Sequence, residues 1–222
     1  MNKQQVIIIG SSGHSKVIID IFEKTQQYTL LGLLDATRKP GDETMGYKVL
    51  GKEEDLPRLI NENAGCQVIV AIGDNWVRQK VVNNVLAIMP GISFASAIHP
   101  SAQIARNVVI GKGVAIMPGA IINSDTLIGD FTIINTKASI DHDGEMSGFS
   151  SLGPNATIGG RVTIGEGSAV SISATVIHNI NIGRHSLIGA GAVLMEDCDD
   201  YMVMHGVPAQ KIRSREPGEK YL

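Results

Sequence analysis

An aliphatic residue or methionine recurs at every sixth position from Ile98 to Leu194, and this period constrains the fold more than any other feature of the sequence. A period of six matches neither an α-helix nor a simple alternating strand, so it indicates a short strand and a bend, repeated. Hexapeptide repeats of this kind build a parallel β-helix, in which three hexads, about eighteen residues, form one triangular coil. We expect the aliphatic side chains to fill the interior, and the glycines that follow many of them, such as Gly111 and Gly165, to tolerate the bends.

The first 90 residues follow a different pattern, in which short apolar runs alternate with longer amphipathic segments. Alternating strands and helices are typical of a small parallel sheet, here a truncated Rossmann-like unit. The link between the two parts lies near Pro90-Gly91, which divides the chain into an α/β domain over 1–90 and a β-helix domain over 91–222. The last ten residues are expected to be loose. We expect strands over 6–9, 30–34 and 67–72, and helices over 15–24, 53–61 and 74–89.

Composition and charge exclude several classes of protein. The net charge of −3 favours neither nucleic acid nor an anionic membrane as a partner. No apolar run approaches the ~20 residues needed to span a bilayer, and the N-terminal residues lack the pattern of a signal peptide. Cys66 and Cys198 have no metal-binding or redox spacing, so a reducing, cytoplasmic location is the simplest expectation.

The segment KASIDHDGEM places a histidine and three acids within five positions of the otherwise aliphatic repeat. His142 stands two residues after Ile140, at an outward position, and the eighteen-residue coil places Gly160 directly above it. The missing side chain leaves a slot beside the imidazole, wide enough in principle for a thioester arm. Arg161 falls above Asp143, so that carboxylate either orients the histidine or forms a structural ion pair. A solvated turn is the alternative interpretation of the whole cluster.

A catalytic metal is not expected from the histidine pattern. Carbonic anhydrases built on β-helices bind zinc with three histidines, two of them five residues apart and one two coils away. His142 and His178 have the two-coil separation, but Gly183 stands five residues after His178 and His185 is out of register. The tetrahedral ligand set of zinc is therefore incomplete.

In the first domain, polar residues follow the predicted strands. The loop from Gly10 to Gly13 opens a helix, whose N-terminal N–H groups and dipole can receive a phosphate. GSSGH is not a complete G-x-G-x-x-G, so it does not indicate a dinucleotide site. Asp35 ends the second strand, where it can contact a ribose or base or cap a turn. Asn75 and Arg78 follow the third strand at its carboxyl end, where parallel sheets bind ligands.

Taken together, these motifs resemble the bacterial sugar O-acyltransferase family, which includes the sialic-acid O-acetyltransferases. The chain is most similar to its nucleotide-amino-sugar N-acetyltransferase branch, the bacillosamine-pathway and perosamine enzymes. The resemblance extends over nearly the whole chain. Its elements, in order, are GSSGHSK, Asp35, AIGDNWVR, IINTKASIDHD, the hexads and the terminal GVPAQKI.

The resemblance implies a left-handed β-helix, a homotrimer, acetyl-CoA bound between adjacent β-helices, no metal, and a role for each matching residue. His142 would be the general base, with Asp143, often glutamate in the family, as its orienter. Ser151 departs from the bacillosamine-type enzyme, which has a second histidine there. The resemblance assigns substrate binding to Gly10, Gly13, His14, Asp35, Gly73, Asn75, Asn135 and Ser151, and CoA binding to Gly160, Ile172, Ala190 and Pro208.

The function implied is acetyl-CoA-dependent N-acetylation of the 4-amino group of a nucleotide-linked 4-amino-4,6-dideoxy sugar, for surface-glycan synthesis. Direct attack by the amine is expected, because no cysteine or activated serine stands beside His142. O-acetylation of sialic acid or a related sugar is one alternative, because an amine and a hydroxyl make similar demands on a base. A non-catalytic trimeric scaffold is the other. The sequence does not distinguish UDP, dTDP and GDP.

Overall fold

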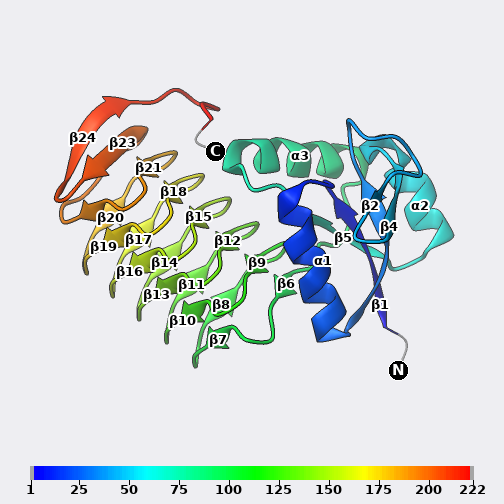
Figure 1. Cartoon of the computed structure of the whole chain (residues 1–222), viewed down its shortest axis with the longest axis horizontal. Coiled ribbons are helices and arrows are strands. Elements are labelled where there is room, and N and C mark those ends of the chain that lie inside the picture. Colours follow the sequence, from blue (N-terminus) through cyan, green and yellow to red (C-terminus); the bar gives the residue numbers. More distant parts are fainter. Residues whose placement is uncertain (1–2, 221–222) are drawn as a thin grey trace.

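The six-residue period folds as predicted. In the computed structural model, which describes residues 3–220, two-residue strands β6 to β22 follow one another through the hexad region (Figure 1). The second residue of each strand is the recurring aliphatic residue or methionine. The strands are β6 (Ala97–Ile98), β7 (Gln103–Ile104), β8 (Val109–Ile110), β9 (Ala115–Ile116), β10 (Ile121–Ile122), β11 (Leu127–Ile128), β12 (Ile133–Ile134), β13 (Ser139–Ile140), β14 (Glu145–Met146), β15 (Ser151–Leu152), β16 (Thr157–Ile158), β17 (Thr163–Ile164), β18 (Ala169–Val170), β19 (Thr175–Val176), β20 (Asn181–Ile182), β21 (Leu187–Ile188) and β22 (Val193–Leu194).

The strands stack into three parallel sheets, because each pairs with the strand eighteen residues further on, as Ile122 does with Ile140. We call the sheet that contains β6, β9, β12, β15, β18 and β21 the first face, the sheet from β7 to β22 the second face, and the sheet from β8 to β20 the third face. The first corner joins the first face to the second, and the other corners follow in chain order. The predicted fold class, a Rossmann-like domain followed by a left-handed parallel β-helix, is confirmed.

The bends are built differently from the sequence prediction. The left-handed residue stands three positions after the aliphatic residue and is often Asn, Asp or Gly, as at Asp125 (φ 61°) and Asp143 (φ 56°). The glycine immediately after the aliphatic residue serves another purpose. A Cβ at Gly129 would lie 2.7 Å from the Met146 carbonyl oxygen, and one at Gly165 would lie 2.6 Å from the Arg184 nitrogen. These glycines therefore permit the close approach of the next coil, not the bend.

The N-terminal domain is a five-stranded sheet of order β3-β4-β2-β1-β5, in which only the β3–β4 pair is antiparallel. The predicted strands and helices are all present with shifted ends. The short hairpin of β3 and β4 was not predicted from the sequence, because two- and five-residue strands carry little periodic signal. The elements are β1 (Gln4–Ile9), α1 (Gly13–Thr25), β2 (Tyr28–Leu34), β3 (Glu43–Thr44), β4 (Tyr47–Gly51), a 3₁₀ turn (Glu53–Asp55), α2 (Leu56–Glu62), β5 (Gln67–Val70) and α3 (Asn75–Ile88).

The first face of the β-helix packs against the N-terminal domain. Outward side chains of this face, Ala115 and Ile133, join the apolar cluster of α1 and β1 that includes Ile18. Beside this cluster, Phe131 at a third-corner turn stacks on Phe149 one coil above, with ring centroids 5.0 Å apart. The apolar contact fixes the N-terminal domain along the flank of the first coils, with α3 running beside the third corner.

The C-terminal residues close the far end of the β-helix. Strand β23 (Met202–Gly206) pairs with β21 and then with β24 (Ala209–Ser214) in a hairpin. The following residues, up to Lys220, are held by contacts, contrary to the sequence prediction of a loose tail; residues 221–222 of that prediction lie outside the described residues. The Arg215 N–H donates to the Tyr201 carbonyl over 2.8 Å, and Arg213 forms an ion pair with Glu219.

Candidate active site

The His142–Asp143 pair lies at the second corner, immediately after β13. His142 Nδ1 is 2.7 Å from Asp143 Oδ2. An ionised carboxylate only accepts hydrogen bonds, so the proton of the neutral ring belongs on Nδ1 and the lone pair on Nε2. This is the tautomer that a general base requires. In a single chain the pair is open to solvent, because the two side chains are 49% and 54% exposed.

Gly160 lies directly above His142, as predicted. A Cβ at Gly160 would be 2.8 Å from His142 Nε2 and 2.9 Å from Cε1. The ring therefore uses the space that the glycine leaves, and that space is not a slot for a thioester arm. Any side chain at this position would push the imidazole out of its observed place.

The alternative role of Asp143 as an ion-pair partner of Arg161 is not observed. The Arg161 guanidinium turns to the next coil, where Nε donates to Asn179 Oδ1 over 2.6 Å. Asp143 is therefore left to orient His142.

A cavity of about 250 Å³ lies at the first corner, where the N-terminal domain meets the β-helix. Six of the residues assigned by the sequence resemblance line it: His14, Gly73, Asn135, Ser151, Ile172 and Ala190. Seven further residues complete its wall: Ile133, Leu152, Gly153, Pro154, Ala169, Val170 and Ser171. Two of them, Ile133 and Ala169, are the outward residues of first-face strands, a place that the six-residue period indicates. The others are interior or corner residues.

The cavity and the histidine pair occupy different corners of the coil. His142, Asp143 and Gly160 are not part of the cavity lining. Pro208 is also elsewhere, in the exposed turn between β23 and β24. One chain therefore presents two separate half-sites, one at the first corner and one at the second.

The glycine loop brings His14 to the cavity at the start of α1. Burial and the nearby positive charge of Arg78 lower the pKa of His14 to about 4. The side chain is therefore neutral near pH 7, and it can act as a hydrogen-bonding group but not as a cation for a diphosphate. Gly10 and Gly13 belong to the same loop but do not line the cavity.

Asp35 uses its carboxylate within the domain. Oδ2 accepts from the Ser11 N–H and hydroxyl, over 3.0 and 2.6 Å, and Oδ1 accepts from Thr37 and Arg38. Although burial opposes ionisation, these hydrogen bonds hold the pKa of Asp35 well below its usual range. The carboxylate ties the glycine loop to the loop after β2, as in the turn-capping alternative.

Asn75 and Arg78 join the two domains. The Asn75 amide is 2% exposed and donates to the carbonyls of Gly167 and Ser168 at the third corner. The buried Arg78 guanidinium donates to the carbonyls of Phe131 and Phe149 on the β-helix, over 2.8 and 3.1 Å. The structure places both side chains between the domains, where they donate to main-chain carbonyls of the β-helix. They are therefore interdomain contacts and not the ligand contacts that were predicted.

Arg78 also holds the cavity wall. Its Nη1 donates to the carbonyls of Ile72 and Gly73, each over 3.0 Å, and its Nη2 donates to Asn75 Oδ1 over 2.7 Å. We call Arg78 and Asn75 together the interdomain clamp. No local sequence pattern indicates the interdomain clamp, because its acceptors on the β-helix lie more than fifty residues away.

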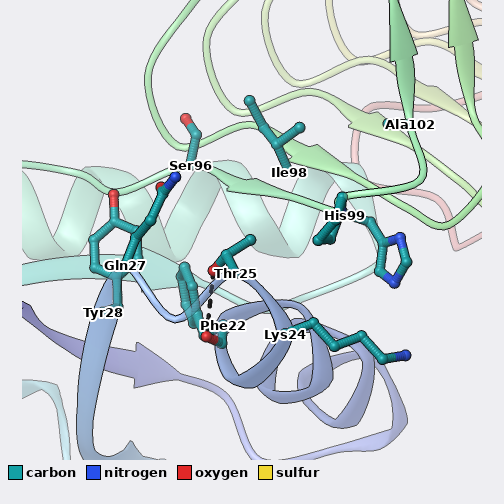
Figure 2. A pocket seen from close by; sticks show the side chains of 10 residues that line it. Phe22, Lys24, Thr25, Gln27, Tyr28, Ser96, Ile98, His99 and Ala102 are labelled. Atoms are coloured by element: carbon teal, nitrogen blue, oxygen red, sulfur yellow. Dashed lines mark hydrogen bonds between the residues drawn. The ribbon is translucent and has the colours of Figure 1, made fainter.

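A second cavity, of about 660 Å³ and thus larger than the first, lies at the opposite end of the first face, between the last turn of α1 and the first coil (Figure 2). Phe22, Tyr28, Ile98 and His99 contribute to its wall. None of the predicted site residues lines it, so size alone does not identify the reactive site.

Within residues 3–220, no three metal-ligating side chains come together in one cluster. His185 lies instead between Tyr201, on which it stacks, and the edge of Trp76. The helices of this same part of the chain are all too short or too polar to cross a membrane.

Comparisons with known proteins agree with the fold of both domains. The family model described as the PglD N-terminal domain matches residues 5–85. Perosamine N-acetyltransferase from Caulobacter crescentus, solved with CoA and GDP-perosamine, is 37% identical with a TM-score of 0.88, over 95% of this chain and 97% of that one. The acetyltransferase domain of PglB from Neisseria gonorrhoeae, solved with acetyl coenzyme A, is 28% identical with a TM-score of 0.84, over 95% and 100%.

A third structure shows the fold alone. WeeI from Acinetobacter baumannii is 20% identical with a TM-score of 0.74, over 95% of this chain and 100% of that one. No curated protein matches the sequence.

Proposed function

Since the chain belongs to the PglD- and perosamine-type family of acetyl-CoA-dependent sugar acetyltransferases, we propose that it acetylates the 4-amino group of a nucleotide-linked 4-amino-4,6-dideoxy sugar. The similarity to an enzyme solved with CoA and GDP-perosamine supports this substrate class. A non-catalytic scaffold is not supported, because the similarity extends over the whole length of catalytic relatives. The product would enter surface-glycan synthesis.

The observation that carries the proposed mechanism is the His142–Asp143 hydrogen bond. With the proton on Nδ1, Nε2 takes a proton from the amine as its nitrogen attacks the acetyl carbonyl of the thioester. Asp143 stabilises the imidazolium that forms. The C–N bond forms, the C–S bond breaks, and the proton held on Nε2 passes to the departing CoA sulfur.

The main-chain N–H of Gly160 is a suitable donor for the developing oxyanion. It stands at the same place in its corner as the N–H of His142, and no acceptor within residues 3–220 takes it. A fixed donor of this kind stabilises the charge that appears only in the transition state.

Direct attack is favoured over an acyl-enzyme. Cys66 and Cys198 are both buried, and burial raises the pKa of each thiol to about 11. A buried thiol of high pKa is a poor nucleophile. Acetyl-CoA would reach the amine along Ile172 and Ala190, with Pro208 at the adenine end.

A second copy of the chain would complete the site, because the half-sites lie at different corners. The coil below the His142 pair exposes apolar side chains on both faces that meet there: Ile121 is 43% exposed and Leu127 is 47% exposed. Exposed apolar residues beside a catalytic pair mark a surface that another chain covers. We expect a cyclic homotrimer in which His142 of one copy serves the cavity of the next.

The substrate proposal is tested by incubating the protein with acetyl-CoA and a panel of UDP-, dTDP- and GDP-linked 4-amino sugars, with sialic acid as the O-acetylation alternative. We expect N-acetylation of one nucleotide-linked sugar. Turnover of sialic acid alone would contradict the substrate class.

The base is tested with His142→Ala, for which kcat should fall about 10²- to 10⁴-fold with substrate binding retained. His178→Ala is the matched control, because His178 is an exposed histidine in the same column, two coils above. A near wild-type kcat/KM in His142→Ala would contradict the mechanism.

Sharing of the site between copies is tested by complementation. Ser151→Trp fills the cavity and His142→Ala removes the base, so each variant alone should be inactive. Coexpressed, the two should regain activity in mixed trimers. Inactive mixed trimers, or an active monomer, would contradict a shared site.

A further inference from the structure

The main-chain N–H of His142 lies outside the hydrogen-bond ladder of the β-helix. The ladder uses the neighbouring groups: the Asp141 N–H donates to Ile158 and the Asp143 N–H donates to Ser124, over 3.0 and 3.1 Å. The N–H between them is not used by the adjacent coils, so it is available to a side-chain acceptor. Three N–H groups at this place in other corners have one: Lys112 donates to Asp130, Thr136 to Asn135 and Arg184 to Asp200.

Asp141 supplies the acceptor for His142. The His142 N–H donates to Asp141 Oδ1 over 2.8 Å, and Asn123, one coil below, donates to the same oxygen from Nδ2 over 2.8 Å. The carbonyl of Asp141 is fixed as well, because the hydroxyl of the buried Thr126 donates to it over 3.1 Å. Asp141 is therefore held on both its side chain and its main chain.

We propose that Asp141, held by Asn123, is a positioning residue that fixes the main chain of His142 so that Nε2 faces the reacting amine. This inference rests on the proposed role of His142 as the base. The Asp143 hydrogen bond and the contact with Gly160 set the rotation of the ring, but both depend on where the main chain carries it. Asp141 joins that main chain to the coil below, and it is not itself a catalytic residue.

The charge of Asp141 adds a second effect. The hydrogen bond from Asn123, and then that from the His142 N–H, lower the pKa of Asp141, so it is a carboxylate throughout the neutral range. A carboxylate here stabilises an imidazolium. Three other charged groups lie near the His142 corner, as judged from their positions in the coils: Asp143 in the same corner, Asp125 in the coil below and Arg161 in the coil above.

Two substitutions separate position from charge. Asp141→Asn keeps an oxygen for the two hydrogen bonds and removes the charge, whereas Asp141→Ala removes both. We expect Asp141→Ala to lower kcat about 10- to 100-fold, with both KM values within about twofold, because a small displacement of a catalytic group is costly. Asp141→Asn should restore most of kcat and move the acidic limb of the kcat profile to lower pH, since the imidazolium has lost a stabilising charge.

The matched control is Asp125→Asn. Asp125 accepts from Asn107 Nδ2 over 2.9 Å, an Asn–Asp contact between coils of the same kind, one coil below and away from the His142 main chain. Asp125→Asn should leave kcat unchanged and move the pH profile less than Asp141→Asn does, because Asp125 makes no hydrogen bond to the His142 main chain. An Asp141→Ala variant with kcat within twofold of wild type, or a loss shared by Asp125→Asn, would overturn the proposal.

A readout without substrate distinguishes this inference from the proposed function. The ¹⁵N chemical shifts of the His142 ring report which nitrogen carries the proton. We expect a single tautomer in wild type and Asp141→Asn, and a mixture of tautomers in Asp141→Ala. A wild-type protein that acetylates no sugar yet shows these spectra would refute the proposed function alone. A single tautomer in all three proteins would refute the positioning role.

Discussion

The two domains use their polar side chains in opposite ways. In the α/β domain, Asp35 forms its hydrogen bonds with loops of the same domain, and Asn75 donates across the interface to the β-helix. In the β-helix, His142 and Asp143 stand on the surface and bond to each other. The difference follows from the architecture. Irregular loops need side chains to satisfy their main chain, whereas the β-helix ladder satisfies most of its own and leaves corner side chains available for chemistry.

The domains also differ in how they depend on individual residues. The β-helix repeats one stabilising unit, so each interior position has the same role. The junction of the two domains, in contrast, depends on a few unrepeated contacts, which include the buried interdomain clamp. Three substitutions and one change of pH test this contrast, in order of decreasing expected effect.

Arg78→Met should have the largest effect. It removes the guanidinium but keeps an apolar chain, and it takes the Arg78 donor from the buried carbonyl of Phe131 and the part-buried carbonyls of Phe149, Ile72 and Gly73. We expect the free energy of unfolding to fall by about 3–5 kcal/mol, measured by urea denaturation. Arg58→Met is the control, since its pairs with Asp55 and Glu62 are exposed. A loss as small as in the control would mean that the junction does not depend on the clamp.

Ile158→Ala should be next. Ile158 is 1% exposed and faces the interior, so the substitution removes packed atoms and leaves a cavity. The expected loss is about 2–4 kcal/mol in the same urea experiment. Thr157→Ala, at the exposed outward position of the same strand, should cost less than about 0.5 kcal/mol. Similar losses at both positions would contradict the stabilising role of the interior aliphatic residue.

Acid should destabilise the α/β domain through His14. Its pKa is lowered to about 4 in the folded chain, whereas an unfolded histidine has its ordinary pKa of 6.5. Between these values the unfolded state binds more protons, so stability falls as pH drops from about 6.5 to 4.

At about 1.36 kcal/mol per pKa unit, the contribution of His14 is about 3 kcal/mol at most. Urea denaturation of wild type and His14→Gln at several pH values isolates it, because the other histidines are common to both proteins. Parallel curves for the two proteins would show that His14 is not the group responsible.

Gly160→Ala should have the smallest effect on stability and a specific effect on rate. The added Cβ would meet the His142 ring at under 3 Å, and a ring can shift where a main chain cannot. We expect kcat to fall about tenfold with little change in the thermal midpoint. Gly91→Ala, which has open space around the added atom, is the control. Unchanged kcat would show that the ring position tolerates displacement.

Local pattern was enough to predict most of the fold. The six-residue period gave the coils, the placement of Gly160 above His142, and the outward position of the histidine. Strand and helix alternation gave the core of the α/β sheet. The hairpin of β3 and β4 was not predicted, because segments of two and five residues are too short to show a hydrophobic period.

The candidate site was predictable only in part. Six of its residues do line one cavity, and a sequence resemblance was enough to find them. The roles of Asp35 and Asn75 were not predictable, because a polar residue after a strand serves a ligand or a loop equally well. The distinction depends on partners such as Ser11 and Gly167, which only folding brings near.

The sequence by itself determined the repeating half of this protein, because a β-helix residue's environment is set by its place in the hexad and by the residue eighteen positions away. It thus specified the interior, the corners and the His142 column. Only the tertiary structure decided which polar side chains are used for structure, that Arg78 and Asn75 join the domains, and that the cavity and His142 lie at different corners. Those outcomes depend on contacts between distant segments, in which desolvation and hydrogen-bond geometry select partners that no local period encodes.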